Sequence, residues 1–289
     1  MTGPSARYAP AMAFHPGLNK IVLFGGTSSN TATPPAETWT WDGTTWTLLS
    51  PATQPSSRSQ AAMVYDSNRQ RLVLFGGVNV GQISRLNDTW EFDGTTWTQI
   101  TTANTPSIRA SPGMAYDSQR QRVVLYGSTT SSDTWEYDGT NWTQRTPSAF
   151  PPARSQTPMA FDAASSVSVI FSGYDASPAM TAFTDTWTWS GSSWSRRTTS
   201  GNPSARWGHA LVAAEDGLLL FGGSTATAIY VSDTWLWNGR SWITRAPAMS
   251  PSARYIHGMA FDPVRRKLVL FGGYGTGANV LADTWEYGP

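Results

Sequence analysis

The feature that most constrains this chain is an eleven-residue stretch that begins at Asp88 and reads Asp-Thr-Trp-Glu-Phe-Asp-Gly-Thr-Thr-Trp-Thr. Related stretches return through the chain, beginning at Glu37, Asp133, Asp185 and Asp233, with a shortened copy from Asp283 to Tyr287. A repeat period of roughly 50 residues is typical of propellers and other arrays, in which each unit buries its apolar surface against its neighbours. The repeat therefore decides the architecture before any single residue does.

The spacing within the repeat is nearly constant. From the acidic residue that opens the stretch to its last tryptophan is nine positions in all five complete copies. From that tryptophan to the next arginine is always twelve positions, and from the arginine to a glycine position is eighteen, or sixteen in the fifth unit. Length varies mainly in the loop after the glycines. We therefore expect six units of one design that differ in this loop.

Each unit has the pattern of four antiparallel strands. The first begins at an arginine and carries small residues and an aromatic, at 7–14, 58–65, 109–116, 154–161, 206–213 and 254–261. The second is a short apolar run before the glycines, which is typical of a buried strand. In the third, aromatics two apart, such as Trp39 and Trp41, share one face. An Asp-Gly hairpin signal, as in Asp93-Gly94, leads to the fourth strand.

With a double glycine and a later aromatic–turn–tryptophan in most units, the chain resembles the kelch repeat over essentially its whole length. The version Asp-Thr-Trp-Glu-Tyr-Asp-Gly is most similar to bacterial kelch proteins. The resemblance implies an all-β fold, a six-bladed propeller of four-stranded antiparallel blades that forms a single domain over residues 1–289. Unit six reaches only Tyr287-Gly288-Pro289, so we expect blade six to lack its outermost strand and to expose an edge suited to self-association.

Composition excludes several kinds of chemistry. The net charge is +1 and charged residues make up 13% of the chain, so we expect no nucleic-acid or membrane-surface partner. The chain has no cysteine, which excludes disulfides and thiolate nucleophiles. Three histidines offer little for a metal site, and we expect no metal or cofactor. The absence of cysteine and the scarcity of lysine suit an exported bacterial domain, but a cytoplasmic one nearly as well.

The start of the first strand, the end of the second and the start of the third meet at one rim of the channel in such a meander. This places six arginines at that rim: Arg7, Arg58, Arg109, Arg154, Arg206 and Arg254. Each could bind a carboxylate, sulfate or phosphate of a ligand. Alternatively, each could reach over the glycines to the acidic residue of its own unit, at Glu37, Asp88, Asp133, Asp185, Asp233 or Asp283. One arginine and one acid per unit favours this second, structural reading.

Departures from the repeat mark a second set of candidates. Three residues after the arginine, units five and six carry His209 and His257. Beside the arginine, units five, six and one carry Trp207, Tyr255 and Tyr8. These units are neighbours in a closed ring, so the side chains could form an aromatic–histidine cluster that stacks a sugar or holds an anion. Alternatively, the histidines are ordinary strand residues hydrogen-bonded to a neighbouring turn.

Three functions remain open. The first is a non-enzymatic module that binds a protein, peptide or carbohydrate at the arginine rim, and the lack of a coherent catalytic set favours it. The second is an enzyme acting on an acidic sugar, resembling kelch-type sialic-acid epimerases, with His209 and His257 as acid and base. The third is a structural or assembly module of a larger protein, for which the exposed edge of blade six is the motivating feature.

Overall fold

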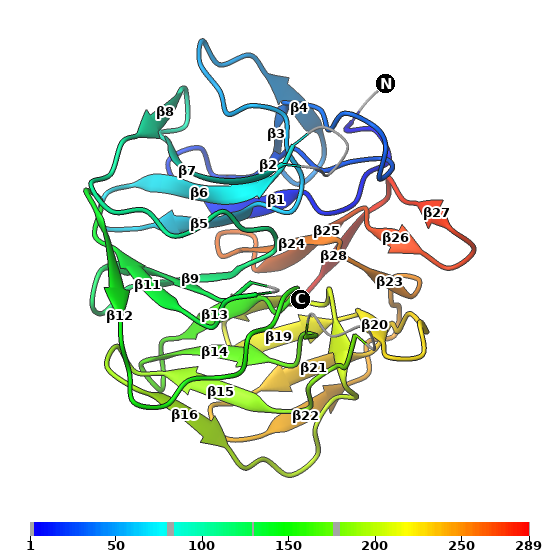
Figure 1. The fold of residues 1–289 in the computed structure, drawn as a ribbon. Helices are drawn as coiled ribbons and strands as arrows, with labels where there is room; N and C mark the ends of the chain where they lie inside the picture. The colour runs from blue at the N-terminus through cyan, green and yellow to red at the C-terminus, as the bar shows by residue number, and fades with distance from the viewer. Residues whose placement is uncertain (1–2, 80–83, 129, 176–179, 289) are drawn as a thin grey trace.

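The computed structural model describes residues 3–79, 84–128, 130–175 and 180–288, and these contain strands and turns but no helix. Five sheets of four antiparallel strands and one of three surround a common axis, which confirms the predicted six-bladed propeller (Figure 1). In every blade the strands that follow one another in the meander are hydrogen-bonded neighbours. Among the described residues there is no helix that could span a membrane.

Within each blade, the strands follow one another outward from the axis in sequence order. The innermost strands line the channel and are β1 (Ala11–His15), β5 (Ala62–Asp66), β9 (Gly113–Asp117), β13 (Met159–Asp162), β18 (Ala210–Ala214) and β24 (Gly258–Asp262). The second strands are the most buried and are β2 (Lys20–Phe24), β6 (Arg71–Val78), β10 (Arg122–Tyr126), β14 (Val167–Phe171), β19 (Gly217–Phe221) and β25 (Lys267–Phe271). Their continuous apolar runs suit burial on both faces.

The third and fourth strands form the outer part of each blade. The third strands are β3 (Thr38–Trp41), β7 (Arg85–Phe92), β11 (Thr134–Tyr137), β15 (Thr186–Trp189), β21 (Thr234–Trp237) and β28 (Thr284–Tyr287). The fourth strands lie at the periphery in Figure 1 and are β4 (Trp46–Leu49), β8 (Trp97–Ile100), β12 (Trp142–Arg145), β16 (Trp194–Arg197) and β22 (Trp242–Arg245). Blade six ends at β28 and has three strands, as predicted.

The first strands begin later than the sequence indicated. We expected β1 to start at Arg7, but it starts at Ala11, and the other blades shift in the same way. The cause is a residue in the left-handed backbone region two positions after each arginine, with φ between 47° and 61°: Ala9, Gln60, Ser111, Gln156, Gly208 and Ile256. A left-handed residue breaks a strand. The arginine segment therefore pairs separately, and in blades five and six it forms short sheets from β17 (Arg206–Trp207), β20 (Ser224–Thr225), β23 (Arg254–Tyr255), β26 (Tyr274–Gly275) and β27 (Asn279–Val280).

The same six left-handed residues form a closed ring of backbone hydrogen bonds around the axis, which we call the amide ring. Each N–H donates to the carbonyl oxygen of the equivalent residue in the preceding blade. The N···O distances are 2.6 Å for Ala9 to Ile256, 3.0 Å for Gln60 to Ala9, 2.8 Å for Ser111 to Gln60, 3.3 Å for Gln156 to Ser111, 3.0 Å for Gly208 to Gln156 and 2.6 Å for Ile256 to Gly208. The bond from Ala9 to Ile256 joins blade one to blade six, so the ring is closed.

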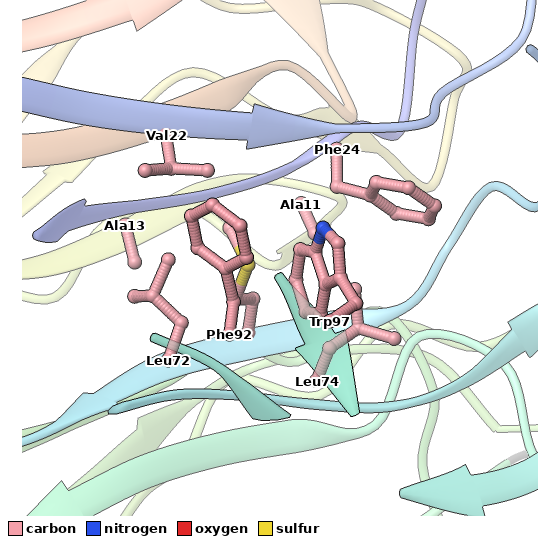
Figure 2. Close-up of a cluster of buried hydrophobic side chains, with 9 residues drawn as sticks. Ala11, Ala13, Val22, Phe24, Leu72, Leu74, Phe92 and Trp97 are labelled. Atoms are coloured by element: carbon pink, nitrogen blue, oxygen red, sulfur yellow. The ribbon is translucent and has the colours of Figure 1, made fainter. Parts of the chain in front are cut away.

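Neighbouring blades pack through clusters of apolar side chains. Figure 2 shows the cluster between blades one and two, where Val22 and Phe24 of β2 face Leu72 and Leu74 of β6, with Trp97 among them. The indole N–H of each fourth-strand tryptophan donates to a threonine hydroxyl of the preceding blade. These bonds join Trp46 to Thr284 (2.9 Å), Trp97 to Thr38 (3.0 Å), Trp142 to Thr89 (2.9 Å), Trp194 to Thr134 (2.8 Å) and Trp242 to Thr186 (3.0 Å). The indole thus fills a cluster and satisfies its single donor.

Candidate functional site

The six arginines lie together at one rim, as predicted, and every one is paired. The ion pairs join Arg7 to Glu37, Arg58 to Asp88, Arg109 to Asp133, Arg154 to Asp185, Arg206 to Asp233 and Arg254 to Asp283, at 2.6–2.8 Å. In all but the first, the pair is bidentate, with Nη1 donating to Oδ1 and Nη2 to Oδ2 of the carboxylate. The structural alternative, an arginine reaching over the second strand to its own acid, is therefore what the geometry shows.

The remaining donors of each guanidinium are also used. In Arg58, Nε donates to the Ser56 carbonyl, Nη1 to the Gly76 carbonyl and Nη2 to the Ser56 hydroxyl. Four other arginines have equivalent partners, and Arg154 differs in lacking the serine hydroxyl and lying 3.9 Å from the centre of the Phe183 ring. All six are at most 1% exposed. A ligand could reach these guanidiniums only by displacing a carboxylate.

The pairs also set the ionisation of the acids. Burial alone would raise the pKa of Asp88, but hydrogen bonds and charge attraction from Arg58 lower it overall. Glu37, Asp133, Asp185, Asp233 and Asp283 likewise have pKa values lowered by hydrogen bonds and by the charge of their own arginine. In each blade the tryptophan two residues after the acid donates its indole N–H to the same carboxylate. The carboxylates therefore stay ionised well into mildly acidic solution.

The central channel forms a cavity of about 590 Å³ on the side of the amide ring that faces away from the arginine rim. Its lining runs from His209 and His257 to exposed residues at the turns after the first strands, such as Pro16 and Pro263. The lining residues include no acid, arginine or lysine. The residues of the amide ring do not line the cavity. The side chains of Ile256 and Gln156 lie close to Gly208, because a Cβ added there would be 2.9 Å from Ile256 and 3.0 Å from Gln156. The lack of a side chain at Gly208 therefore leaves room for these two. The channel is therefore narrowed at the arginine rim and open at the opposite face.

His209 and His257 lie on the cavity side of the amide ring rather than with the rim aromatics. Burial, and then the charges of Arg206 and Arg254, lower the pKa of both imidazoles, that of His257 to about 3. No described residue donates to or accepts from their ring nitrogens. Their rings instead contact Phe171 and Phe221 of the preceding blades. The expected hydrogen bond to a neighbouring turn is not present in the described part of the chain, and both imidazoles are neutral near pH 7.

The predicted aromatic cluster at units five, six and one is larger than the sequence indicated. Tyr255 stacks on Tyr230 with a ring-centre distance of 4.8 Å, and Tyr274 packs edge-on against Tyr255 at 5.7 Å and Tyr8 at 5.6 Å. We call these four residues the tyrosine patch. Trp207 lies apart from it, against Tyr174 of blade four at 5.4 Å. Of the aromatic candidates, the structure therefore brings Tyr8 and Tyr255 together and separates Trp207.

Sequence reasoning missed Tyr230 and Tyr274. Tyr274 directly follows the glycine pair of blade six, and in the sheet it pairs with Tyr255, the residue after the arginine. The same two positions pair in blade one as Tyr8 and Thr27. The signal for Tyr274 was therefore present in the register of the repeat. Tyr230 lies in the variable loop of blade five, where the repeat offers no such guide.

Comparisons with known proteins agree with this architecture. A family model described as the KLHDC2/KLHL20/DRC7 Kelch-repeats domain matches residues 1–173. A search of curated proteins found no match. The described residues contain no group of three or more histidine, aspartate or glutamate side chains that could hold a metal ion.

Proposed function

The chain belongs to the kelch-repeat family, and on that premise we propose that it is a non-enzymatic module that binds a protein segment at the arginine-side rim. Kelch-repeat domains generally mediate protein interactions. The proposed contact surface is the tyrosine patch, with the variable loops of blades five, six and one around it. The buried arginine pairs support this surface because they hold the start of the first strand against the start of the third strand in each blade.

The observation that carries the proposal is the tyrosine patch itself. Each of these four rings, which come from three blades, lies within 6.3 Å of at least one other, and Tyr230, Tyr255 and Tyr274 remain half-buried. Beside them Ile229 is 60% exposed. Tyrosine is enriched at protein interfaces because it offers a large ring and a hydroxyl at a small cost in side-chain entropy. Rings that already pack against one another lose little further freedom when a partner binds.

The features of the site favour a protein segment over an acidic sugar. An acidic sugar needs a cation to pair with its carboxylate, and the rim guanidiniums are already bonded to carboxylates. The acid–base alternative would place its chemistry in the cavity, where His209 and His257 have no acidic neighbour among the lining residues. We therefore propose no enzymatic activity.

The test is a selection of short peptides from a random display library on the folded chain, followed by binding measurements on variants. Peptides that use the tyrosine patch should lose at least about tenfold in affinity with Tyr255→Ala or Tyr230→Ala. Tyr65→Ala, on the opposite face, is the matched control and should leave the affinity unchanged. Circular dichroism checks that each variant is folded.

Two outcomes would contradict the proposal. Selected peptides that respond to Tyr65→Ala and not to Tyr255→Ala would place the site at the opposite face. A parallel thermal-shift screen with sialic and uronic acids tests the sugar alternative. If an acidic sugar raises the unfolding midpoint and folded Arg206→Ala/Arg254→Ala does not respond, the arginines contact a ligand and the sugar reading replaces ours.

A further inference from the structure

The outer edge of blade six differs from every other blade. β28 pairs with β25 on one side, and no described residue pairs with its other edge. Blade three provides a direct comparison, because its third strand carries the same five residues, Asp-Thr-Trp-Glu-Tyr, at 133–137 as blade six carries at 283–287. In blade three the edge is covered by β12, and Tyr137 is fully buried. In blade six Tyr287 is 40% exposed.

A hollow lies beside this edge, between blades five and six, and we call it the tryptophan socket. It is lined by Phe221, Thr234, Met259, Leu270 and Tyr287, among others. The equivalent residues of blades two and three surround the indole of Trp142 and are Phe75, Thr89, Met114, Leu125 and Tyr137. The socket therefore has the same lining residues as an occupied tryptophan site. They include Thr234, at the position of the threonine that accepts the indole hydrogen bond in blade two.

We propose that the β28 edge and the tryptophan socket bind an extended segment that carries a tryptophan and comes from outside residues 1–289. The segment adds antiparallel to β28, its tryptophan lies opposite Tyr287, and the indole N–H donates to Thr234. Strand addition supplies main-chain hydrogen bonds and the socket supplies specificity. This site is separate from the tyrosine patch, and the proposal does not depend on what binds there.

The edge also indicates a second feature of the segment. In blade three, Arg145 lies three residues after Trp142 and its Nε donates to Glu136 Oε2 at 2.8 Å. The equivalent acid in blade six is Glu286, whose Oε1 accepts from Trp41 and Arg265. An arginine three residues after the tryptophan of the incoming strand would reach the other oxygen of Glu286. We therefore expect the pattern Trp-x-x-Arg in the bound segment.

A second copy of this chain is a poor source of such a strand. Its five fourth strands, of which β12, β16 and β22 carry this pattern, are each paired within their own blade. An unpaired Trp-x-x-Arg segment from outside residues 1–289 meets no such cost.

Entry of the indole requires one side chain to move. The socket has a volume of about 40 Å³, which is less than an indole needs, and Met249 lies at its lip with 80% exposure. At two of the other positions equivalent to Met249, Thr53 and Gly201 lie beside the tryptophan of the next blade, and Thr53 hydrogen-bonds the backbone of that tryptophan. Methionine is flexible and can turn aside to cover an inserted ring.

The test uses a labelled peptide of residues 138–147, which contains the β12 strand, and measures its fluorescence anisotropy with the 289-residue chain. We expect saturable binding. The Trp142→Ala peptide should bind at least about tenfold more weakly, as expected for the loss of a central aromatic anchor. Thr234→Val in the protein should weaken binding roughly fivefold, because it removes the indole acceptor at nearly constant shape.

Thr89→Val is the matched control, because the Thr89 hydroxyl accepts from Trp142 inside the chain, and it should leave peptide affinity unchanged. Absence of binding, or equal binding of the Trp142→Ala peptide, would overturn the proposal. Analytical sedimentation of the protein without peptide tests whether a second copy of the chain occupies the edge instead. If the chain forms a dimer that Tyr287→Arg abolishes, a second copy covers the edge and the proposal fails.

Discussion

Each buried arginine ties three segments of its blade together, because its guanidinium bonds the preceding turn, a carbonyl just after the second strand and the acid at the start of the third strand. A buried charge is costly unless it is matched and fully hydrogen-bonded. The six sites meet this condition with nearly the same partners each time. The effect of losing one arginine should therefore come mainly from the carboxylate left behind.

We predict that Arg109→Met lowers the free energy of unfolding by about 3–5 kcal/mol, since Asp133 keeps a largely buried, unmatched charge. Urea denaturation measures the change. Arg240→Met, at an exposed turn position, is the control and should alter stability by less than about 0.5 kcal/mol. Similar losses in both variants would mean that the Arg109 pair adds nothing beyond a surface charge.

The buried histidines predict a pH dependence. The pKa of His257 is about 3 in the folded chain against an ordinary value of 6.5. The unfolded chain therefore binds the proton more readily, and stability falls as the pH drops below 6.5. The slope from this group approaches about 1.4 kcal/mol per pH unit.

His257→Thr should reduce this slope between pH 6.5 and about 5, where the paired carboxylates remain ionised. Blade four already carries Thr157 at this position, with its hydroxyl donating to the Phe171 carbonyl at 3.1 Å. Urea midpoints at several pH values measure the effect. Parallel curves for the two proteins would show that His257 is protonated equally in both states.

At the scale of elements, turns at the end opposite the arginine rim join each blade to its neighbour. Arg69, in the turn after β5, pairs with Asp66 and Glu91 of its own blade. The hairpin of the next blade lies over this arginine, because a Cβ on Gly139 would be 2.5 Å from Arg69 Cδ. The same contact joins Gly191 to Arg120 and Gly43 to Arg265. Glycine is required there both by its φ of about +100° and by this approach.

Gly139→Ala should therefore destabilise the chain by about 1–2 kcal/mol from the backbone alone, and by more from the displaced Arg69. Gly201→Ala is the matched control. Its φ is also positive, but the nearest atom to an added Cβ is 3.8 Å away. The difference between the two thermal midpoints isolates the contact between blades. Equal midpoints would show that Arg69 moves aside without loss.

The sequence predicted the blades and the arginine pairs because both depend on residues at fixed spacing. Arginine, glycine and acid recur with little change, so their meeting could be inferred from strand order alone. The left-handed residues two positions after the arginines were missed, because Ala9, Gln60 and Ile256 are not residue types that favour this backbone region. The tyrosine patch was only half found, since Tyr230 comes from a loop whose path no repeat determines.

At the scale of the whole molecule, the propeller has one interface unlike the rest. Five interfaces between blades contain a tryptophan bonded to a threonine, and the interface between blades five and six contains none among the described residues. The amide ring holds the inner ends of blades five and six together regardless. We therefore expect the outer part of blade six to open more readily than the rest of the molecule.

Hydrogen exchange can test this with an internal control. Residues 133–137 and 283–287 have the same sequence, so their intrinsic exchange rates are closely matched. We predict that outward-facing amides of β28 exchange roughly tenfold faster or more than those of β11, corresponding to an opening free energy lower by about 1.4 kcal/mol. Equal protection would mean that blade six is as firmly held as blade three.

The amide ring has a further consequence for what the rim can attract. An α-helix leaves unpaired donors at one end and unpaired acceptors at the other, and its aligned peptide dipoles give each end a partial charge. The six bonds of the ring run head to tail around a circle and have no ends. Their dipoles follow one another around the axis and largely cancel, so the backbone draws neither anions nor cations to this mouth. Charge selectivity here is left to side chains, which can change without disturbing the closure of the fold.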